Sequence, residues 1–166
     1  MKTTMRILSA AALAATLAGC ADSVSAPEAM QAMPADQKAS LKIANISADA
    51  DPGIEMSDAD FSIVVQKVHE YIDAQRPGMI ADGPGGAQMK IHFTRFDRGS
   101  AFARAMLIGL GQIRIEANVI LANSAGAPIG EYKVSKDFAL GGAVGAATSV
   151  TDVEEGFAKS VAEIVK

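Results

Sequence analysis

The sequence has one cysteine, two histidines and fewer basic than acidic residues, and each of these scarcities excludes a class of protein. Because Cys20 is the only cysteine, the chain cannot form an intramolecular disulfide. His69 and His92 belong to no close cluster of metal ligands in the sequence, so we expect them to be solvated or hydrogen-bonded structural residues. With 15 basic and 19 acidic residues, the chain lacks the basic character of nucleic-acid-binding proteins. We therefore expect no metal, no cofactor and no nucleic-acid partner.

The N-terminus has the three parts of a secretory signal sequence. Lys2 and Arg6 give a basic start, residues 7–18 are almost entirely apolar, and the run ends in small residues. A segment that crosses a bilayer needs roughly 20 apolar residues, and this run is shorter. We therefore predict a signal peptide over residues 1–19.

The residues Leu17-Ala18-Gly19-Cys20 resemble the lipobox of bacterial lipoproteins. The resemblance implies transfer of diacylglycerol to the Cys20 thiol, cleavage before Cys20, and acylation of the new N-terminus, for example with palmitate. Stable anchoring takes two lipid signals, and a triacylated cysteine provides them. Ala21, rather than Asp, follows the cysteine, which by the sorting rule of enteric bacteria implies the outer membrane. We expect a lipid-anchored envelope protein at the outer membrane, facing the periplasm.

The mature chain divides into two parts. Residues 20–38 are rich in Ala, Ser, Pro, Glu and Gln and show no strand or helix periodicity, which predicts a lipidated flexible tether. Residues 39–166 are long enough for a single domain with its own core.

The predicted domain begins with a strand and a helix. Leu41 and Ile43 alternate with polar or small residues, which favours a short strand, and residues 45–56 are expected to form a loop. Ser57 and Asp60 have the spacing of a capping box, so a helix with one apolar face is expected to start at Ser57.

Three further strands are expected in the second half. The first covers residues 88–96, with a bulge near Thr94 or Arg95 that restores the alternation of apolar residues. The other two cover residues 112–121 and 131–138, and the turn between them predicts an antiparallel hairpin.

A final helix is expected from Thr151, with Glu154 completing a capping box. The order is then strand, helix, strand, short apolar segment, strand, strand, helix. This order predicts an α+β fold, a mostly antiparallel four-stranded sheet with two helices on one face.

Two apolar segments interrupted by glycine, residues 99–111 and 138–147, flank the expected hairpin. Neither is long enough to cross a bilayer. Gly141 and Gly145 have the spacing that lets helices approach closely, and Gly142 lies between them. Three interpretations stay open: tightly packed buried turns, a contact surface for self-association or for a partner, and shallow insertion into a nearby bilayer.

A polar cluster, Asp97-Arg98-Gly99-Ser100, precedes the first of these segments. We expect a turn in which Ser100 caps a helix. The alternative is an exposed binding loop.

A second group of polar residues loosely resembles a calcium-binding loop: Asp49, Asp51, Glu55 and Asp60. The glycine stands one place early, and Asp replaces the bidentate Glu that ends such a loop, so most of the ligand geometry is missing. We expect a solvated acidic loop.

The run Phe93-Thr94-Arg95-Phe96-Asp97-Arg98-Gly99-Ser100, the apolar Gly-Leu-Gly stretch, the strongly alternating strand after it and the Gly-Gly segment before the last helix resemble the bacterial lipoprotein family called domain of unknown function 4410. The resemblance extends from about Leu41 to Lys166. It implies an envelope lipoprotein domain without an established activity, and it supplies no catalytic residues.

The sequence contains little that points to catalysis. No Ser/His/Asp arrangement stands out, and no Lys-Ser/Thr pair follows Gly145 as a phosphate-binding loop would require. We therefore expect a non-enzymatic envelope lipoprotein whose domain is a binding or assembly module, with an envelope protein or a second copy as partner. The alternative is a membrane-active or secretion-associated oligomer that uses segments 99–111 and 138–147.

Overall fold

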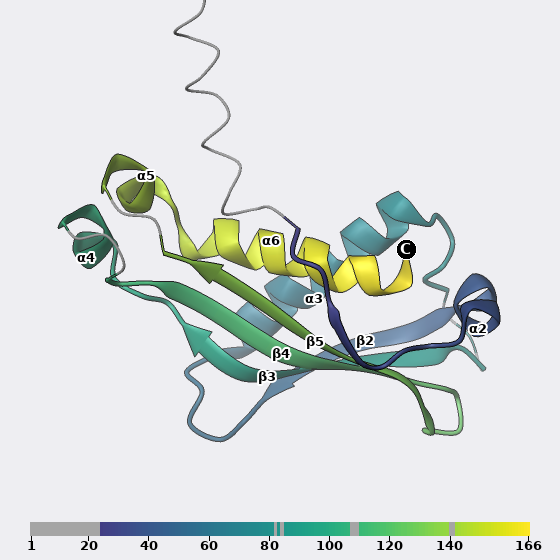
Figure 1. Cartoon of the computed structure of the whole chain (residues 1–166). Helices are drawn as coiled ribbons and strands as arrows, with labels where there is room; N and C mark the ends of the chain where they lie inside the picture. Colours follow the sequence, from purple (N-terminus) through teal and green to yellow (C-terminus); the bar gives the residue numbers. More distant parts are fainter. Residues whose placement is uncertain (1–23, 82, 84, 107–109, 140–141) are drawn as a thin grey trace, which may run out of the picture.

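The computed structural model describes residues 24–81, 83, 85–106, 110–139 and 142–166, so the predicted signal peptide and Cys20 lie outside the described residues. Its centre is a five-stranded sheet in the order β1-β5-β4-β3-β2 (Figure 1). The strands are β1 (Glu28–Gln31), β2 (Ile43–Ala50), β3 (Ala87–Asp97), β4 (Ile113–Ala122) and β5 (Pro128–Phe138).

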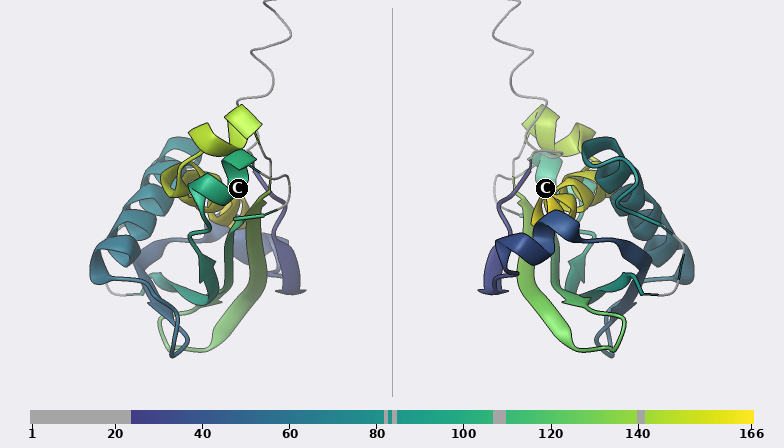
Figure 2. Two further views of the ribbon diagram at one scale, coloured as in Figure 1. Left: turned by 90° about the vertical axis from the view of Figure 1, so that its left-hand side faces the viewer. Right: turned by 90° about the vertical axis from the view of Figure 1, so that its right-hand side faces the viewer.

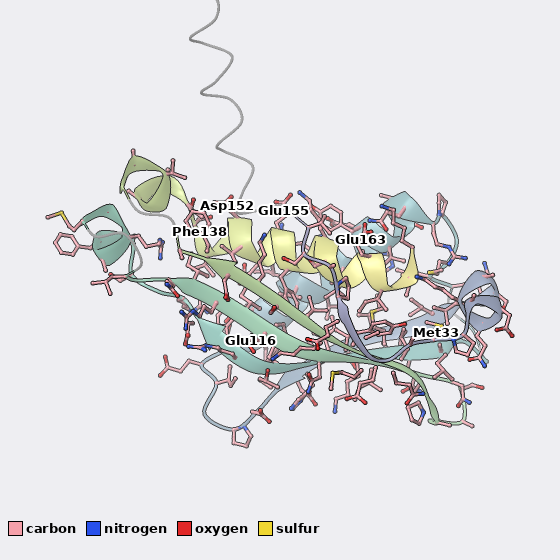
Figure 3. All side chains as sticks on the ribbon, viewed as in Figure 1. Met33, Glu116, Phe138, Asp152, Glu155 and Glu163 are labelled. Atoms are coloured by element: carbon pink, nitrogen blue, oxygen red, sulfur yellow. The ribbon has the colours of Figure 1, made fainter. Side chains whose placement is uncertain are left out.

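The helices differ in length and in what they cover. They are α2 (Ala35–Ser40), α3 (Asp58–Gln75), α4 (Ala101–Met106), α5 (Gly142–Ala147) and α6 (Val150–Ala162), which ends in a 3₁₀ turn. The long helices α3 and α6 pack against each other on one face of the sheet, α3 over β2 and α6 over β4 and β5 (Figures 1 and 2). None of the described helices covers the opposite face, where Glu116 lies 3.3 Å from the ammonium group of Lys133 (Figure 3).

Strand pairing follows from the connections. β1–β5, β5–β4 and β4–β3 are antiparallel, whereas β2 and β3 are parallel. Parallel neighbours need a long crossover, and α3 supplies it. The register of β3 shifts between Phe93 and Arg95, which confirms the predicted bulge. The expected hairpin is confirmed as β4–β5.

The core lies between the sheet and the two long helices. The inward-facing side chains of β4 are fully buried, as the alternation predicts, and they meet the apolar faces of α3 and α6. Phe93 lies at the centre, with ring centroids 5.5 Å from Phe157 and 6.1 Å from Phe61. Full burial of such a side chain is worth about 1.5–3 kcal/mol. We call the sheet with α3 and α6 the body of the domain.

The α+β class is confirmed, but the predicted four-stranded sheet lacks β1, which lies in the expected tether. Glu28 pairs with Lys133, the backbone N–H of Met33 donates to the Tyr132 hydroxyl at 3.0 Å, and Met33 is buried. The expectation of a flexible tether is therefore wrong for residues 28–38. The cause is that a short edge strand is held mainly by backbone hydrogen bonds, which leave no side-chain periodicity.

Two other boundaries differ from expectation. Residues 45–50, predicted as loop, continue β2, because a register shift between Ile43 and Asn45 breaks the alternation in the sequence. The last helix is capped by Ser149 with Asp152 rather than by Thr151 with Glu154. The two capping-box patterns overlap in the sequence, and the earlier one forms.

The capping box at the start of α3 is confirmed. The Ser57 backbone N–H donates to Asp60 Oδ2 at 2.7 Å, and the Asp60 N–H donates to Ser57 Oγ at 3.3 Å. The predicted apolar face of α3 is also present, with Val64, Val68 and Ile72 buried.

Candidate functional site

The two glycine-rich segments form one structure at an end of the sheet, which we call the apical tip: residues 99–106, 110–111 and 142–149. α4 leaves the end of β3 and α5 follows the end of β5, where Phe138 lies, and the two short helices pack against each other (Figures 1 and 3). The sequence indicated that both segments flank the hairpin, and in the structure their helices α4 and α5 are in contact. Gly142 and Gly145 lie in α5, whereas Gly141 lies outside the described residues.

Large apolar side chains of the apical tip face solvent. Phe102 is 77% exposed, Met106 67% and Leu110 53%. The interpretation of segment 99–111 as a buried turn is therefore wrong for these side chains. Apolar groups that gather at an exposed protrusion are typical of an interaction surface.

Arg104, the only charged residue in segment 99–111, points into the apical tip and is 3% exposed. Its guanidinium donates to the carbonyl of Gly111 at 2.8 Å and to that of Thr148 at 3.1 Å. Arg104 thus ties the loop after α4 to the end of α5. The sequence analysis did not single out this residue, although a lone charge in an apolar segment was a usable indication.

Two glycines let the ends of the α4 segment cross closely. Gly99 and Gly111 have φ angles of 63° and 68°, and the Ser100 N–H donates to the Gly111 carbonyl at 3.1 Å. A Cβ atom at Gly99 would lie 2.3 Å from the Gly111 carbonyl oxygen, so only glycine fits. Ser100 caps α4 by accepting the Ala103 N–H at 3.3 Å, as predicted.

Arg98 joins the apical tip to the body. Its guanidinium lies 2.7 Å from Asp60 Oδ2 and stacks 5.0 Å from the centre of the Phe96 ring. Because Asp60 also closes the capping box of α3, the end of β3 is held to the start of that helix. Asp97 instead accepts a hydrogen bond from Arg95 Nε at 2.7 Å. Within the cluster Asp97–Ser100, Arg98 therefore links β3 to α3, whereas Asp97 pairs within its own strand.

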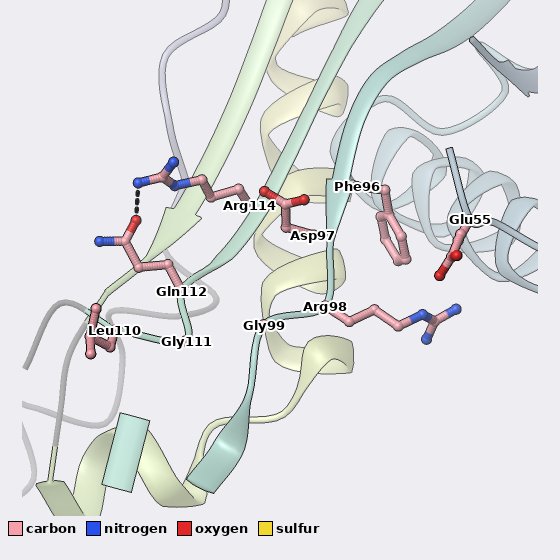
Figure 4. Close-up of a pocket in the computed structure, with 9 residues that line it drawn as sticks. All are labelled: Glu55, Phe96, Asp97, Arg98, Gly99, Leu110, Gly111, Gln112 and Arg114. Atoms are coloured by element: carbon pink, nitrogen blue, oxygen red, sulfur yellow. Dashed lines mark hydrogen bonds between the residues drawn. The ribbon is translucent and has the colours of Figure 1, made fainter. Parts of the chain in front are cut away.

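An open cleft of about 570 Å³ lies under the apical tip (Figure 4). Its charged lining is balanced, two acidic and two basic residues. The full lining is Glu55, Phe96, Asp97, Arg98, Gly99, Leu110, Gly111, Gln112 and Arg114. Arg114 donates to the Gln112 side chain, whereas Arg98 extends toward the Glu55 side of the cleft. The cleft presents groups of both charges and can bind a polar group.

Glu154 lies on α6 and is buried near the Arg98–Asp60 ion pair, at the junction between the body and the apical tip. Burial raises the pKa of its carboxyl group, and the nearby charge of Asp60 adds to the increase, whereas Arg98 and Lys67 oppose it. The expected capping role of Glu154 is thus replaced by a buried acid beside an ion pair.

The predicted solvated acidic loop is present only in part. Asp51 and Glu55 lie in the exposed loop after β2, whereas Asp49 belongs to β2 and Asp60 to α3. His92 lies between two of them, with Nδ1 2.7 Å from Asp49 and Nε2 3.0 Å from Asp51, and these hydrogen bonds raise the pKa of the imidazole. Glu55 lines the cleft and Asp60 caps α3. His92 is a hydrogen-bonded structural residue, as expected. Within the described part of the chain, no group of three or more His, Cys, Asp or Glu residues could hold a metal ion.

The sequence matches a family over residues 37–142, from α2 to the start of α5. The chain belongs to the family described as domain of unknown function DUF4410. The DUF4410 match covers four of the five strands, together with α3, α4 and the Asp97–Ser100 cluster, and it leaves out β1 and α6. No curated protein matches the chain.

The DUF4410 chain also resembles solved structures. A dodecamer of a PelC point variant from Paraburkholderia phytofirmans aligns with a TM-score of 0.54 and 12% identity, covering 86% of this chain and 96% of that one. A second PelC dodecamer from the same organism gives a TM-score of 0.53 and 11% identity, covering 72% and 83%. An uncharacterized protein gives 0.50 and 13%, covering 75% and 90%. At these identities the likeness concerns the fold.

None of the described helices of this DUF4410 chain is both long enough and apolar enough to cross a membrane.

Proposed function

We propose that this DUF4410 chain is a non-enzymatic, lipid-anchored protein of the bacterial envelope whose domain assembles with copies of itself. The anchor is the acylated Cys20 that the lipobox implies. The assembly is supported by one observation above all. The structural alignment with a protein that forms a dodecamer covers 86% of this chain and 96% of that one. A non-catalytic role is supported by the lining of the cleft, in which Arg98 pairs with Asp60 and one terminal guanidinium nitrogen of Arg114 donates to Gln112.

The two edges of the sheet suit such an assembly. Among the described strands, β1 pairs with β5 alone and β2 with β3 alone, apart from a bridge between Ile43 and Ile80. Each edge therefore leaves backbone groups available for another chain. The edges lie on opposite sides and differ in sequence, so contact between them is head-to-tail, the arrangement that closes into rings.

Met30 on β1 provides a way to test this contact, because its side chain is 64% exposed at the sheet edge. We expect residues 21–166 to give a discrete native mass many times that of a monomer by native mass spectrometry. Met30→Lys introduces a charge at the contact and should shift the population toward monomer. Phe102→Ser, a change at the apical tip where the side chain is 77% exposed, should leave the mass unchanged.

Wild-type protein that stays monomeric at tens of micromolar in the same measurement would contradict the proposal. It would mean that the free energy of association between copies is weaker than about 7 kcal/mol. Unfolding curves of each variant separate loss of assembly from loss of fold. A shift to monomer with Phe102→Ser but not with Met30→Lys would relocate the contact to the apical tip.

A further inference from the structure

We propose that the apical tip touches the lipid bilayer to which the chain is anchored, with Phe102, Met106 and Leu110 entering the boundary between headgroups and acyl chains. This inference rests on the proposed anchor for its orientation, and it adds a second membrane contact made by the fold itself. The partner is a neutral lipid surface.

The first argument is the chemistry of the exposed surface. The apical tip displays no formal charge, because Arg104 is turned inward and residues 138–151 contain no acidic or basic residue. This contrasts with a chain that carries a net charge of −4. The apical tip also exposes three small apolar residues, Ala105, Ala143 and Ala146. A neutral, apolar protrusion fits lipid without the basic residues that anionic headgroups would attract.

The second argument is that the apolar side chains are presented by a held structure. Arg104 bridges the α4 loop and α5, and the glycine crossing at Gly99 and Gly111 closes the base of that loop. The side chain of Thr148 donates to the Val144 carbonyl at 2.9 Å and secures the end of α5. Insertion therefore requires no large loss of conformational freedom, which would otherwise oppose binding.

The third argument is the place where the chain leaves the domain. The Ser25 N–H donates to Ser160 Oγ on α6 at 2.7 Å, so the N-terminal end lies on the helix-bearing side. Five Cα–Cα steps separate Cys20 from Ser25, and an extended chain covers at most about 18 Å in that distance. The bilayer must then lie near α6, and the apical tip is on the same side of the sheet (Figure 1). An anchored domain thus faces the membrane with its helix-bearing side, and the apical tip lies at one end of that side.

Contact of this kind is shallow. Side chains at such a boundary reach roughly 5–10 Å into the membrane. The apical tip would therefore orient a domain that the acylated Cys20 already retains. The proposed sheet-edge contacts remain available for neighbouring copies around the same membrane-facing end.

The absence of tryptophan from the sequence allows a direct test on residues 21–166, which contain the whole described core and lack Cys20. Phe102→Trp places a single reporter at the apical tip, and Ile63→Trp places one at the exposed surface of α3, where Ile63 is 43% exposed. Vesicles of phosphatidylcholine and phosphatidylethanolamine should shift the emission of the Phe102→Trp variant to the blue. Brominated lipid should quench the same emission. Neither change should occur with Ile63→Trp.

Flotation of the same protein with these vesicles measures the energetic contribution. We expect Phe102→Ser with Met106→Ser to reduce the bound fraction at least tenfold, Ile63→Ser to leave it unchanged, and added salt to have little effect. Wild-type protein that does not float, equal loss in both variants, or binding that vanishes in high salt would each overturn the inference. Circular dichroism confirms that the variants are folded.

The outcomes are independent of the proposed function. Native mass reports assembly without lipid, and palmitate labelling of full-length wild type against Cys20→Ser reports anchoring. If Phe102→Ser dissolves an assembly and leaves flotation intact, the apical tip is a contact between copies and the lipid inference is wrong. If the protein is monomeric yet floats through Phe102, the assembly proposal alone fails.

Discussion

The body and the apical tip contain similar apolar residues, but these are buried in the body and exposed to solvent in the apical tip. In the body, Phe157 is fully buried against the sheet, whereas Phe102 in the apical tip is 77% exposed. The helices explain the difference. α3 and α6 have 18 and 13 residues and present a long apolar face, whereas α4 and α5 have six residues each. A short helix cannot bury such a face alone, because most helical stability comes from packing.

The two regions are also held together by different forces. The body depends on apolar burial, in which Phe93 contacts aromatic rings from α3 and α6. The apical tip depends on polar contacts, in which the buried Arg104 donates to two carbonyls. The comparison indicates that a surface can remain apolar when buried hydrogen bonds, rather than apolar contacts, fix its shape.

The largest expected effect comes from comparing the two phenylalanines. Phe157→Ala removes a ring from the core and leaves a cavity, so we expect a loss of about 3–5 kcal/mol in the free energy of unfolding. Phe102→Ala should change it by less than about 0.5 kcal/mol, because its ring faces solvent. Urea unfolding followed by circular dichroism measures both. Similar losses for the two variants would show that the apical tip is part of the core.

An intermediate effect is expected from Arg104. Arg104→Leu removes the guanidinium donor to the Thr148 carbonyl and one of the two donors to the Gly111 carbonyl, which keeps the Ser100 N–H. An unsatisfied buried polar group costs about 1–3 kcal/mol. We expect faster hydrogen exchange in residues 99–106 and 142–149, with little change in the strands of the body. Arg95→Leu is the matched control, because Arg95 lies on the exposed side of β3 and pairs with a surface carboxylate there. Faster exchange throughout the body would mean that Arg104 supports the whole fold.

The sequence predicted the body better than the apical tip, and the reason is physical. Alternation in β4 and the capping box of Ser57 and Asp60 are local patterns, so they can be recognised without knowing the fold. β1 has no such pattern, because its place depends on backbone pairing with distant β5. The inward turn of Arg104 depends likewise on Thr148, 44 residues later. Glycine spacing indicated an unusual segment but could not tell which side chains face outward.

The smallest expected effect is a pH dependence at the junction between the body and the apical tip. Burial raises the pKa of Glu154 in the folded state, first through desolvation and then through Asp60. The folded protein therefore holds this proton more tightly than the unfolded chain does. The contribution of Glu154 to stability is complete below the ordinary pKa of 4.5 and decreases as the pH rises through the folded pKa. Glu154→Gln should thus gain stability relative to wild type as the pH increases.

The neighbouring Glu155 provides a control of opposite sign. It accepts a hydrogen bond from Tyr71 at 2.7 Å and lies 3.2 Å from Lys159, and these contacts lower the pKa of its carboxyl group (Figure 3). Its contribution to stability is present above pH 4.5 and is lost as the pH falls through the lowered pKa. Glu155→Gln should therefore lose stability relative to wild type as the pH increases. Urea unfolding from acidic to neutral pH should give difference curves of opposite slope for the two adjacent glutamates. Parallel curves would mean that Glu154 has access to solvent and that the junction beneath the apical tip is open to water.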